Sequence, residues 1–529
     1  MELTRTSESK WVRRAGIALA LLVTVQLGAC TTPDNSSDTA PPSSTLTDET
    51  PQPGRFLPKQ ETTWEARQLG KADTPEDQRL NLIDSYRITR GPSTAVRFPG
   101  EFEPQSQLLV GWVYGQSMGG ASLDTFFLDI IRGAWGVATI VIPSSSSSVR
   151  SAMRSAIKQM LSAAGRNPAE ADDSRYLSFV SIALDSVWAR DFGPQFVEHT
   201  NGRLSIVDTR YYRYRVQDDR VPSLLAKQYG INVFRPSISQ EGGNFQANGA
   251  GECFTSRGSI YFNAPDPSES AHLELYKKYF GCKRLHFLYP LEGEGTTHID
   301  MFMMVIGERD IVVGQYRASD DCTNRDLLEK NVQILASIKD GNGQPYFRIH
   351  RIPMPPNKDG VWRTYTNFQM VRSAVDPGRG VVLLPVYSGL SSYQNEMLAT
   401  LESAFKSAHP SVSWTILPIN ADRIIRGNGA IHCVVHEIPA GTFSKAETDP
   451  SDLCGNAISC QSNGCGSIST AGLCDGNNLV YCSTDQFGNK LGVTWLPCAT
   501  PCQMADSGQP CAKSCGWNAS QGYYDCVAR

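Results

Sequence analysis

Four side chains of this sequence combine the groups needed to break a carbon–nitrogen bond of a guanidinium. Cys433 offers a thiol, His298 an imidazole, and Asp191 and Asp300 two carboxylates. A guanidinium is planar, permanently charged and presents its N–H donors as a fork, which two carboxylates can bind from two directions. Its central carbon is stabilised by resonance, so a soft and strong nucleophile such as a thiolate is needed. The set predicts a thiol-dependent hydrolase of guanidinium groups.

The same groups suggest an order of events. Attack by Cys433 gives a tetrahedral adduct, whose nitrogen leaves only when it is protonated. His298 can donate that proton and later take one from the water that hydrolyses the thiouronium intermediate. The products would be ammonia and a ureido group, as in citrulline. We expect His298 and Asp300 to lie two apart on one strand, with both side chains on the same face.

The elements that must position these residues repeat within residues 91–443. Each cycle reads as a helix, a strand and a hairpin, and the hairpins are expected at 188–208, 243–262, 298–316 and 366–387. The fifth cycle ends in a single arm at 430–437, whose missing partner we place at 107–114. Closing a ring in this way removes exposed sheet edges. The predicted fold is an α/β domain built as a closed five-bladed propeller, with an extra helix and strand at 121–142 that belong to no repeat.

Polar residues fall at equivalent positions of this repeat. They lie near the first arm of successive hairpins and are Asp191, Asn244, His298 with Asp300, Asn367 and Cys433. Equivalent positions of a ring converge on its axis. We therefore expect one central pocket.

Four ordered motifs carry a family resemblance. They read WARDFGP at 188–194, EGGN at 241–244, GEGTTHID at 293–300 and GNGAIHC at 427–433. Together they resemble the agmatine deiminase and bacterial peptidyl-arginine deiminase family over about residues 95–440. The resemblance implies the pentein-like five-bladed α/β propeller of guanidino-modifying enzymes. It also implies Cys433 as nucleophile, His298 as acid and base, Asp191 and Asp300 as guanidinium ligands, and no metal or organic cofactor.

The stretch 210–219 bears on the rest of the substrate. Arg213 and Arg215, two apart on a strand, would repel the amine of agmatine and could clamp a carboxylate. The stretch resembles the peptidyl-arginine branch, in which paired arginines hold the α-carboxylate of a C-terminal arginine. We therefore predict deimination of arginine to citrulline in peptides or proteins, with C-terminal arginine preferred. The alternatives are an agmatine deiminase, which would make N-carbamoylputrescine for putrescine biosynthesis, and a catalytically inactive surface binding protein.

Several candidates have a structural alternative. Trp188, Asn244 and Asn367 are expected to contact substrate, but Trp188 could belong to the core and Asn244 could only support its loop. Asp191 could close a turn before Gly193 and Pro194, and Arg213 and Arg215 could be an exposed strand face. Two further residues near the motifs have no catalytic part in this prediction. Glu241 is expected in a tight turn, and His432, on a strand, would point away from the thiol.

The N-terminus has the features of an export signal. Lys10, Arg13 and Arg14 precede an apolar run at 15–25 that is too short to span a bilayer. The small residues before Cys30 resemble a bacterial lipoprotein cleavage site, which makes residues 1–30 a signal peptide and Cys30 a lipid anchor. An ordinary signal peptide or a membrane anchor is the alternative. Residues 31–90 are interpreted as a flexible linker and N-terminal extension, so the predicted location is the bacterial cell envelope, at the outer membrane or surface, or the medium.

Cysteines are concentrated in residues 450–529, where ten of the fifteen lie between Cys454 and Cys526. In an exported chain this density predicts a small disulfide-rich domain, here with an unknown surface partner, and zinc binding is the alternative. Outside it, a Cys282–Cys322 bridge would leave Cys253 buried and Cys433 free. The net charge of −4 comes without a basic cluster, which argues against nucleic acid as a partner.

Overall fold

The computed structural model describes residues 56–60, 91–212, 214–236, 238–262 and 268–447, together with the backbone of five strands beyond them. The predictions for the signal peptide, for Cys30 and for Arg213 lie outside these residues, as does the pairing of the tail cysteines. The tail strands form one sheet of three and one of two, β20 (Leu473–Asp475), β21 (Asn478–Thr484) and β22 (Lys490–Pro497), then β23 (Ser514–Asn518) and β24 (Tyr523–Val527). No helix in the described part is long and apolar enough to cross a membrane.

Within residues 91–447 as described, five sheets share one plan. Two strands pair antiparallel, and a third runs parallel to the second. The first three sheets contain β7 (Gln195–His199), β8 (Leu204–Val207) and β9 (Val233–Phe234), then β10 (Phe245–Ala247), β11 (Glu252–Ser256) and β12 (Arg284–Leu288), then β13 (Met303–Gly307), β14 (Asp310–Gln315) and β15 (Arg348–Pro353). The other two contain β16 (Gln369–Arg372), β17 (Arg379–Val386) and β18 (Ser413–Asn420), then β19 (Val435–Pro439), β2 (Gln105–Val110) and β5 (Thr139–Pro143).

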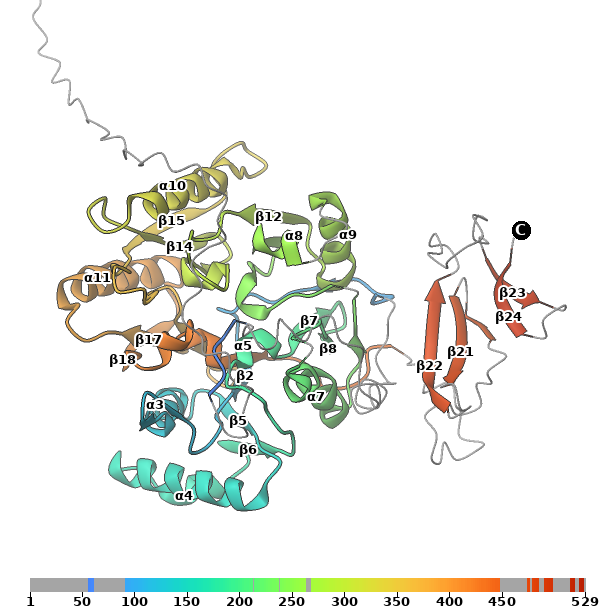
Figure 1. Ribbon diagram of the computed structural model, residues 1–529, viewed down its shortest axis with the longest axis horizontal. Helices are drawn as coiled ribbons and strands as arrows, with labels where there is room; N and C mark the ends of the chain where they lie inside the picture. Colours follow the sequence, from blue (N-terminus) through green and yellow to red (C-terminus); the bar gives the residue numbers. More distant parts are fainter. Residues whose placement is uncertain are drawn as a thin grey trace, which may run out of the picture. The chain divides into compact units, whose positions relative to one another are not determined.

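A helix connects the second and third strand of each sheet, because a parallel neighbour can be reached only by a crossover. These helices are α7 (Val221–Tyr229), α9 (Glu269–Phe280), α10 (Cys322–Ser337), α11 (Ser391–Ala408) and α3 (Asp124–Ala134). Their ends follow helix-capping chemistry: Ser268 and Asp321 accept backbone N–H groups at the starts of α9 and α10, and Gly281 ends α9 with a φ of +71°. The sheets lie around a centre near α5 (Ala189–Phe192), with the helices outside (Figure 1).

This order corrects the predicted repeat. Each helix and strand completes the sheet of the hairpin before it, not of the hairpin after it. The helix and strand expected at 121–142 therefore have a place, as α3 and β5 of the sheet that begins with β19 and β2. Further elements lie outside the common plan. After the helix α4 (Ser147–Ala163), the strand β6 (Leu177–Val180) pairs with β5 and extends its sheet, and β1 (Val96–Arg97) pairs with β7. A short hairpin of β3 (Ser117–Met118) and β4 (Ala121–Ser122) lies apart from the five.

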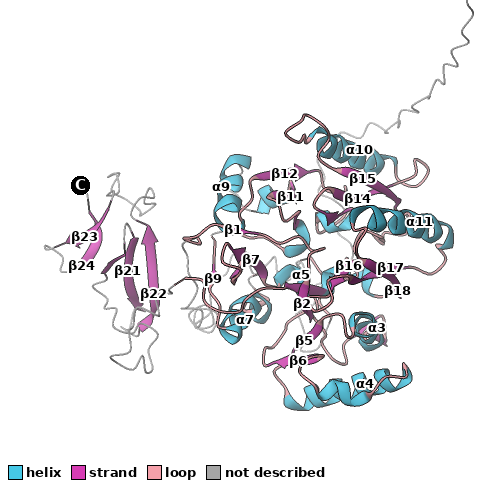
Figure 2. Ribbon diagram, turned by 180° about the vertical axis from the view of Figure 1, so that it is seen from behind, coloured by secondary structure: helices cyan, strands magenta, loops and turns pink. Residues whose placement is uncertain are grey.

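The expected pairing between the two ends of the domain is confirmed. β19 runs antiparallel to β2, with Val435 opposite Val110 and Glu437 opposite Leu108. Seen from behind, β2 lies close to α5, with the other sheets around them (Figure 2). The chain thus brings residues near 435 into the same sheet as residues near 110.

The predicted disulfide was wrong. Cys253 on β11 is bonded to Cys282, two residues before the start of β12, whereas Cys322 is free and half-buried at the start of α10. The reason is the pairing of the two strands, since β11 and β12 are neighbours in one sheet. Cys433 is free, as expected.

Candidate active site

Short helical turns at equivalent places in the sheets hold the candidate residues. Asp191 lies in α5, Asn244 in η2 (Gly242–Asn244), Asp300 in η3 (Ile299–Met301) and Cys433 in η5 (His432–Val434). Each turn directly precedes the first strand of its sheet or is separated from it by one or two residues. The prediction that His298 and Asp300 lie on a strand was therefore wrong, because the strand β13 begins only at Met303.

The thiol of Cys433 is completely buried among polar groups. Asn367 Nδ2 donates to Cys433 Sγ at 3.1 Å, and Asp300 Oδ2 lies 3.6 Å from the same sulfur. Asn367 Oδ1 also accepts from the backbone N–H of Ala430 at 3.1 Å, which fixes the amide beside the thiol. Burial, followed by the charge of Asp300, raises the pKa of the Cys433 thiol.

Asp191 and Asp300 lie beside the same buried ammonium group, and each has one oxygen with unused hydrogen-bonding capacity. Asp191 Oδ2 and Asp300 Oδ1 are buried without a hydrogen-bond partner among the described residues. Lys59 Nζ lies between them, 3.9 Å and 3.6 Å away, and donates to Cys433 Sγ at 2.9 Å. Burial raises the pKa of Asp191 to about 6. Burial acts in the same direction on Asp300, but Lys59 and His432 outweigh it and hold the pKa of Asp300 well below its usual range.

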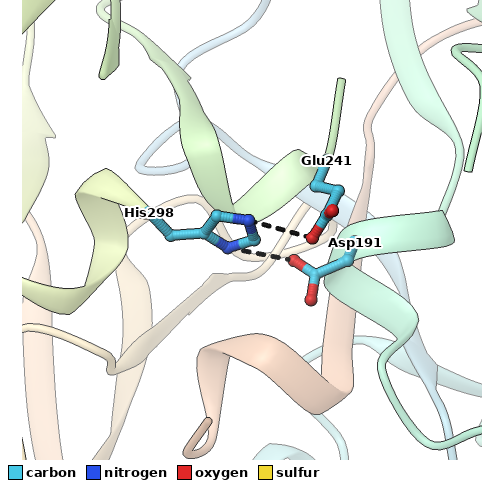
Figure 3. A group of neighbouring side chains, drawn as sticks. All are labelled: Asp191, Glu241 and His298. Atoms are coloured by element: carbon cyan, nitrogen blue, oxygen red, sulfur yellow. Dashed lines mark ion pairs between the residues drawn. The ribbon is translucent and has the colours of Figure 1, made fainter. Parts of the chain in front are cut away.

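His298 lies between two carboxylates, as Figure 3 shows. Its Nε2 is 2.9 Å from Glu241 Oε2, and its Nδ1 is 3.6 Å from Asp191 Oδ1. Burial and the charge of Lys59 lower the pKa of His298, but Glu241 and Asp191 outweigh them, and the net effect is a raised pKa. The imidazole is therefore held ready to carry a proton. Glu241, which was expected only in a turn, is part of the site. The sequence did offer one indication of this role, because Glu241 is an acidic residue in the same motif as the candidate Asn244.

His432 supports the site from the other side. It does not point away, because η5 is a helical turn and not a strand: His432 Nδ1 is 2.9 Å from Asp300 Oδ2, and its Nε2 is 2.8 Å from Glu101 Oε2. Both ring nitrogens are thus paired with buried carboxylates. Glu101 was not anticipated, since no motif surrounds it.

Two glycines allow this close packing. A Cβ atom at Gly243 would lie 2.6 Å from His298 Nδ1 and 2.8 Å from Asp191 Oδ1. At Gly429 it would lie 2.5 Å from the Trp188 ring and 3.0 Å from Cys433 Sγ. At distances below 3.0 Å a neighbouring atom has to shift, so glycine at these positions lets the site residues lie where they do.

The residues predicted to bind substrate fall into different places. Asn367 contacts the thiol, but Asn244 supports its own loop, because its Oδ1 accepts from the backbone of Ser256 at 3.0 Å. Trp188 is buried and donates from Nε1 to the carbonyl of Leu57 at 2.9 Å. Arg215 is not on a strand. It precedes the short helix α6 (Val216–Asp219), is buried, and donates to backbone carbonyls of residues 58–60.

One group of described residues has the spacing of a metal site. Ligand atoms of Asp191, Glu241 and His298 lie within 4.8 Å of one another. The same side chains form the ion pairs of His298, so a divalent cation there would compete with the imidazole for both carboxylates. That the chain needs no metal stays a prediction, which activity in the presence of a chelator would test.

Comparison with known proteins places this geometry in a family. Among curated proteins, the chain is 25% identical over 293 residues to a putative agmatine deiminase of Legionella pneumophila, covering 52% of this chain and 80% of that one. A putative agmatine deiminase of Photobacterium profundum is 22% identical over 377 residues, with 65% and 96% covered.

Solved structures show the same fold. A putative arginine deiminase from Porphyromonas gingivalis superposes with a TM-score of 0.52 at 21% identity, covering 65% of this chain and 99% of that chain. The agmatine deiminase of Enterococcus faecalis gives a TM-score of 0.52 at 19% identity, with 66% and 99% covered. The model of the Porphyromonas-type peptidyl-arginine deiminase family matches residues 97–439, so the chain belongs to that family of guanidino-group deiminases.

Proposed function

We propose that this chain hydrolyses the guanidinium of arginine residues in peptides or proteins to citrulline and ammonia. One observation carries the proposal: two buried carboxylate oxygens, on Asp191 and Asp300, have no hydrogen-bond partner in the described part of the chain and face a cation held against the thiol of Cys433. A guanidinium has five N–H donors in a fixed fork, which suits two separate acceptors better than a single ammonium does.

The contacts support a sequence of steps in which each group has one task. The thiolate of Cys433 adds to the central guanidinium carbon while the two aspartates hold the cation. His298 protonates the departing nitrogen, ammonia leaves, and a thiouronium remains on the sulfur. Water then adds to that carbon, with His298 accepting its proton, and the carbon–sulfur bond breaks to release the ureido product and the thiol. Asn367 and His432 position the sulfur and Asp300.

Recognition of a peptide rests on Arg215. Its guanidinium lies within 4.8 Å of the centre of the Tyr212 ring and donates to main-chain carbonyls of residues 58–60. Such a donor set suits the carbonyls or the carboxylate of a peptide, whereas the terminal amine of agmatine would meet a like charge there. A preference for C-terminal arginine, predicted with Arg213, requires a carboxylate at this place.

Agmatine deiminase is the second candidate. It is favoured by the names of the relatives in Legionella pneumophila and Photobacterium profundum, both putative agmatine deiminases. A binding protein without catalysis is the third, and the assembly of thiol, imidazole and paired carboxylates speaks against it.

Release of ammonia tests all three. The substrates are a peptide ending in arginine, a peptide with internal arginine, free arginine and agmatine, each with wild type, Cys433→Ala and Lys59→Ala. The proposal expects ammonia from at least one peptide and none from Cys433→Ala. Ammonia from agmatine alone would establish the second candidate, and none from any substrate would favour binding.

We also infer the closure of the fold, the export of the chain and the role of its C-terminal segment from the sequence. The five sheets are the blades of a closed propeller, residues 1–30 direct export, and a lipid on Cys30 attaches the chain to the cell envelope. Residues 450–529 form a disulfide-rich module for a surface partner. Partitioning of the wild type into detergent, lost in Cys30→Ala, supports the anchor, and equal partitioning would exclude it.

A further inference from the structure

A second segment of the chain occupies the centre of the candidate active site. Residues 56–60, Phe-Leu-Pro-Lys-Gln, contact residues of the site, although the composition of this region predicted a linker. Lys59 is completely buried, and among the described residues its ammonium makes polar contacts with Cys433, Asp191 and Asp300 alone. Lysines are almost never fully buried unless they are paired. This one is paired with the groups that would hold a guanidinium.

The position of Lys59 Nζ corresponds to the reacting atom of arginine. In lysine the nitrogen Nζ, and in arginine the carbon Cζ, is the fifth atom beyond Cα. Nζ lies 2.9 Å from Cys433 Sγ, close to the separation of about 3–3.5 Å expected between reacting atoms before attack. Lysine has no carbon at this place that a thiolate could attack. It can occupy the site but cannot react.

The backbone around Lys59 is bound as a peptide ligand is bound. Arg215 donates to the carbonyls of Pro58, Lys59 and Gln60 at 2.9, 3.3 and 3.1 Å. On the other side, the backbone N–H of Lys59 donates to the carbonyl of Gly427 at 3.0 Å.

Side chains and pocket residues complete the contact on both sides of the lysine. Trp188 Nε1 donates to the carbonyl of Leu57 at 2.9 Å, and the Phe56 ring packs edge-on against Trp188 with centroids 5.7 Å apart. Asn428 hydrogen-bonds to the Gln60 side chain. Protein groups thus contact the segment along its whole length, from Phe56 to Gln60.

We propose that residues 56–60 are a built-in substrate mimic, with Lys59 in the place of the arginine to be deiminated. The inference rests on the proposed deiminase function and deepens it in two ways. The intact chain is latent toward external substrates until the segment is displaced. In addition, the path of the segment is the path of a peptide substrate, so the site accepts arginine with peptide bonds on both sides.

A lysine-to-arginine exchange turns this idea into a chemical test. In Lys59→Arg, the thiolate adds to Cζ of the introduced arginine, ammonia leaves, and water releases a citrulline at position 59. The net reaction consumes one water and gives one ammonia, and the chain gains about 1 Da. We expect this gain in purified protein, at a rate independent of protein concentration because the reaction is intramolecular, and not in the double variant with Cys433→Ala. An unmodified arginine at position 59 in a chain that deiminates external peptides would overturn the proposal.

Removal of the lysine side chain tests latency. Lys59→Ala is expected to raise kcat/KM for a peptide with internal arginine by on the order of tenfold or more, because the fraction of open sites limits the wild type. Lys406→Ala, an exposed lysine on α11, is the matched control and should behave as the wild type. Equal activity of the wild type and Lys59→Ala would overturn latency.

Binding separates this inference from the proposed function. The peptide Phe-Leu-Pro-Lys-Gln should bind Lys59→Ala in calorimetry and protect Cys433 from alkylation, read by mass mapping, whether or not the variant turns over any substrate. A peptide with alanine in place of the lysine should bind at least about tenfold more weakly, since the two buried carboxylates lose their partner. No binding by either peptide would overturn the inference while leaving the deiminase function intact. Binding without ammonia release from any substrate would support the mimic as a ligand and overturn the function.

Discussion

Two histidines belong to the candidate site around Cys433, and each lies between two carboxylates. His298 is paired with Glu241 and Asp191, and His432 with Asp300 and Glu101. In both, burial opposes the positive charge, but the carboxylates outweigh it, so that the pKa of each imidazole is raised. Composition and electrostatics alone do not tell them apart.

Hydrogen bonding does. Both nitrogens of His432 lie at hydrogen-bond distance from a carboxylate, at 2.9 Å and 2.8 Å. His298 Nδ1 has no hydrogen-bond partner among the described residues, and its nearest carboxylate oxygen is 3.6 Å away. A satisfied imidazole positions its neighbours, whereas one with a free nitrogen at the pocket can exchange a proton with a ligand. This difference in hydrogen bonding assigns proton transfer to His298, whereas His432 holds Asp300 in place.

The sharpest way to break this comparison is to replace each histidine by asparagine. General acid and base catalysis contributes about 10²–10⁴-fold, so His298→Asn should lower kcat by about 10³-fold. His432→Asn keeps a donor toward Asp300 and should lose about tenfold. Ammonia release from an arginine peptide, measured in the Lys59→Ala background so that Lys59 does not fill the pocket, gives both values. Similar losses for the two variants would remove the distinction.

For stability we expect the opposite order, with a larger loss in His432→Asn than in His298→Asn. His432→Asn removes one of the two cations beside buried Glu101 and leaves Arg190 at 3.5 Å, so the free energy of unfolding should fall by about 2 kcal/mol. Because the pKa of His432 is raised in the folded state, its stabilisation is complete below its ordinary pKa and is lost as pH rises through the folded value. The free energies of unfolding of the wild type and of His432→Asn, measured by urea titration, should therefore converge as the pH is increased. A constant difference would show that His432 does not titrate on unfolding.

The sequence predicted the components of this arrangement better than its geometry. Cys433, His298 and the two aspartates were found because each lies in a short motif at the same place in a repeat, and the structure brings them together. The pairing of β19 with β2 followed from the unpaired last arm. Periodicity could not show which hairpin a parallel strand joins, because both neighbours are close in sequence.

What could not be predicted depends on side-chain direction or on distant contacts. His432 was expected to point away because a strand alternates faces, but a helical turn turns it toward Asp300. Asn244 and Glu241 share a motif, yet only Glu241 reaches His298. Lys59 lies in a region whose composition resembles a linker, and only the long-range contacts of its backbone and ammonium distinguish it.

A methyl group at Gly243 would sharpen the comparison from the side of His298. In Gly243→Ala the new Cβ would lie 2.6 Å from His298 Nδ1 and 2.9 Å from Asp300 Oδ2, so the ring must shift. A displacement of about 1 Å can cost about 10²-fold in rate, and we expect a loss of this size in kcat/KM. Gly341→Ala, where the added atom meets nothing within 4 Å, is the control and should be unchanged. Full activity of Gly243→Ala would show that His298 need not lie where it does.

The smallest expected effect is the most specific, because it concerns the proton on one ring. In the Lys59→Ala background, kcat should rise on the acid side as Asp191, whose pKa is raised by burial, ionises, and fall on the basic side as His298 loses its proton. Glu241 is a main cause of the raised pKa of His298. Glu241→Gln removes that charge but keeps the shape, so the basic side should move to lower pH by about one unit. Glu101→Gln removes the corresponding charge from His432 and should leave the basic side in place, because that imidazole transfers no proton to the substrate. If Glu101→Gln moves the profile as far as Glu241→Gln does, the two histidines act as one coupled group, and the difference between their hydrogen bonds does not separate their tasks.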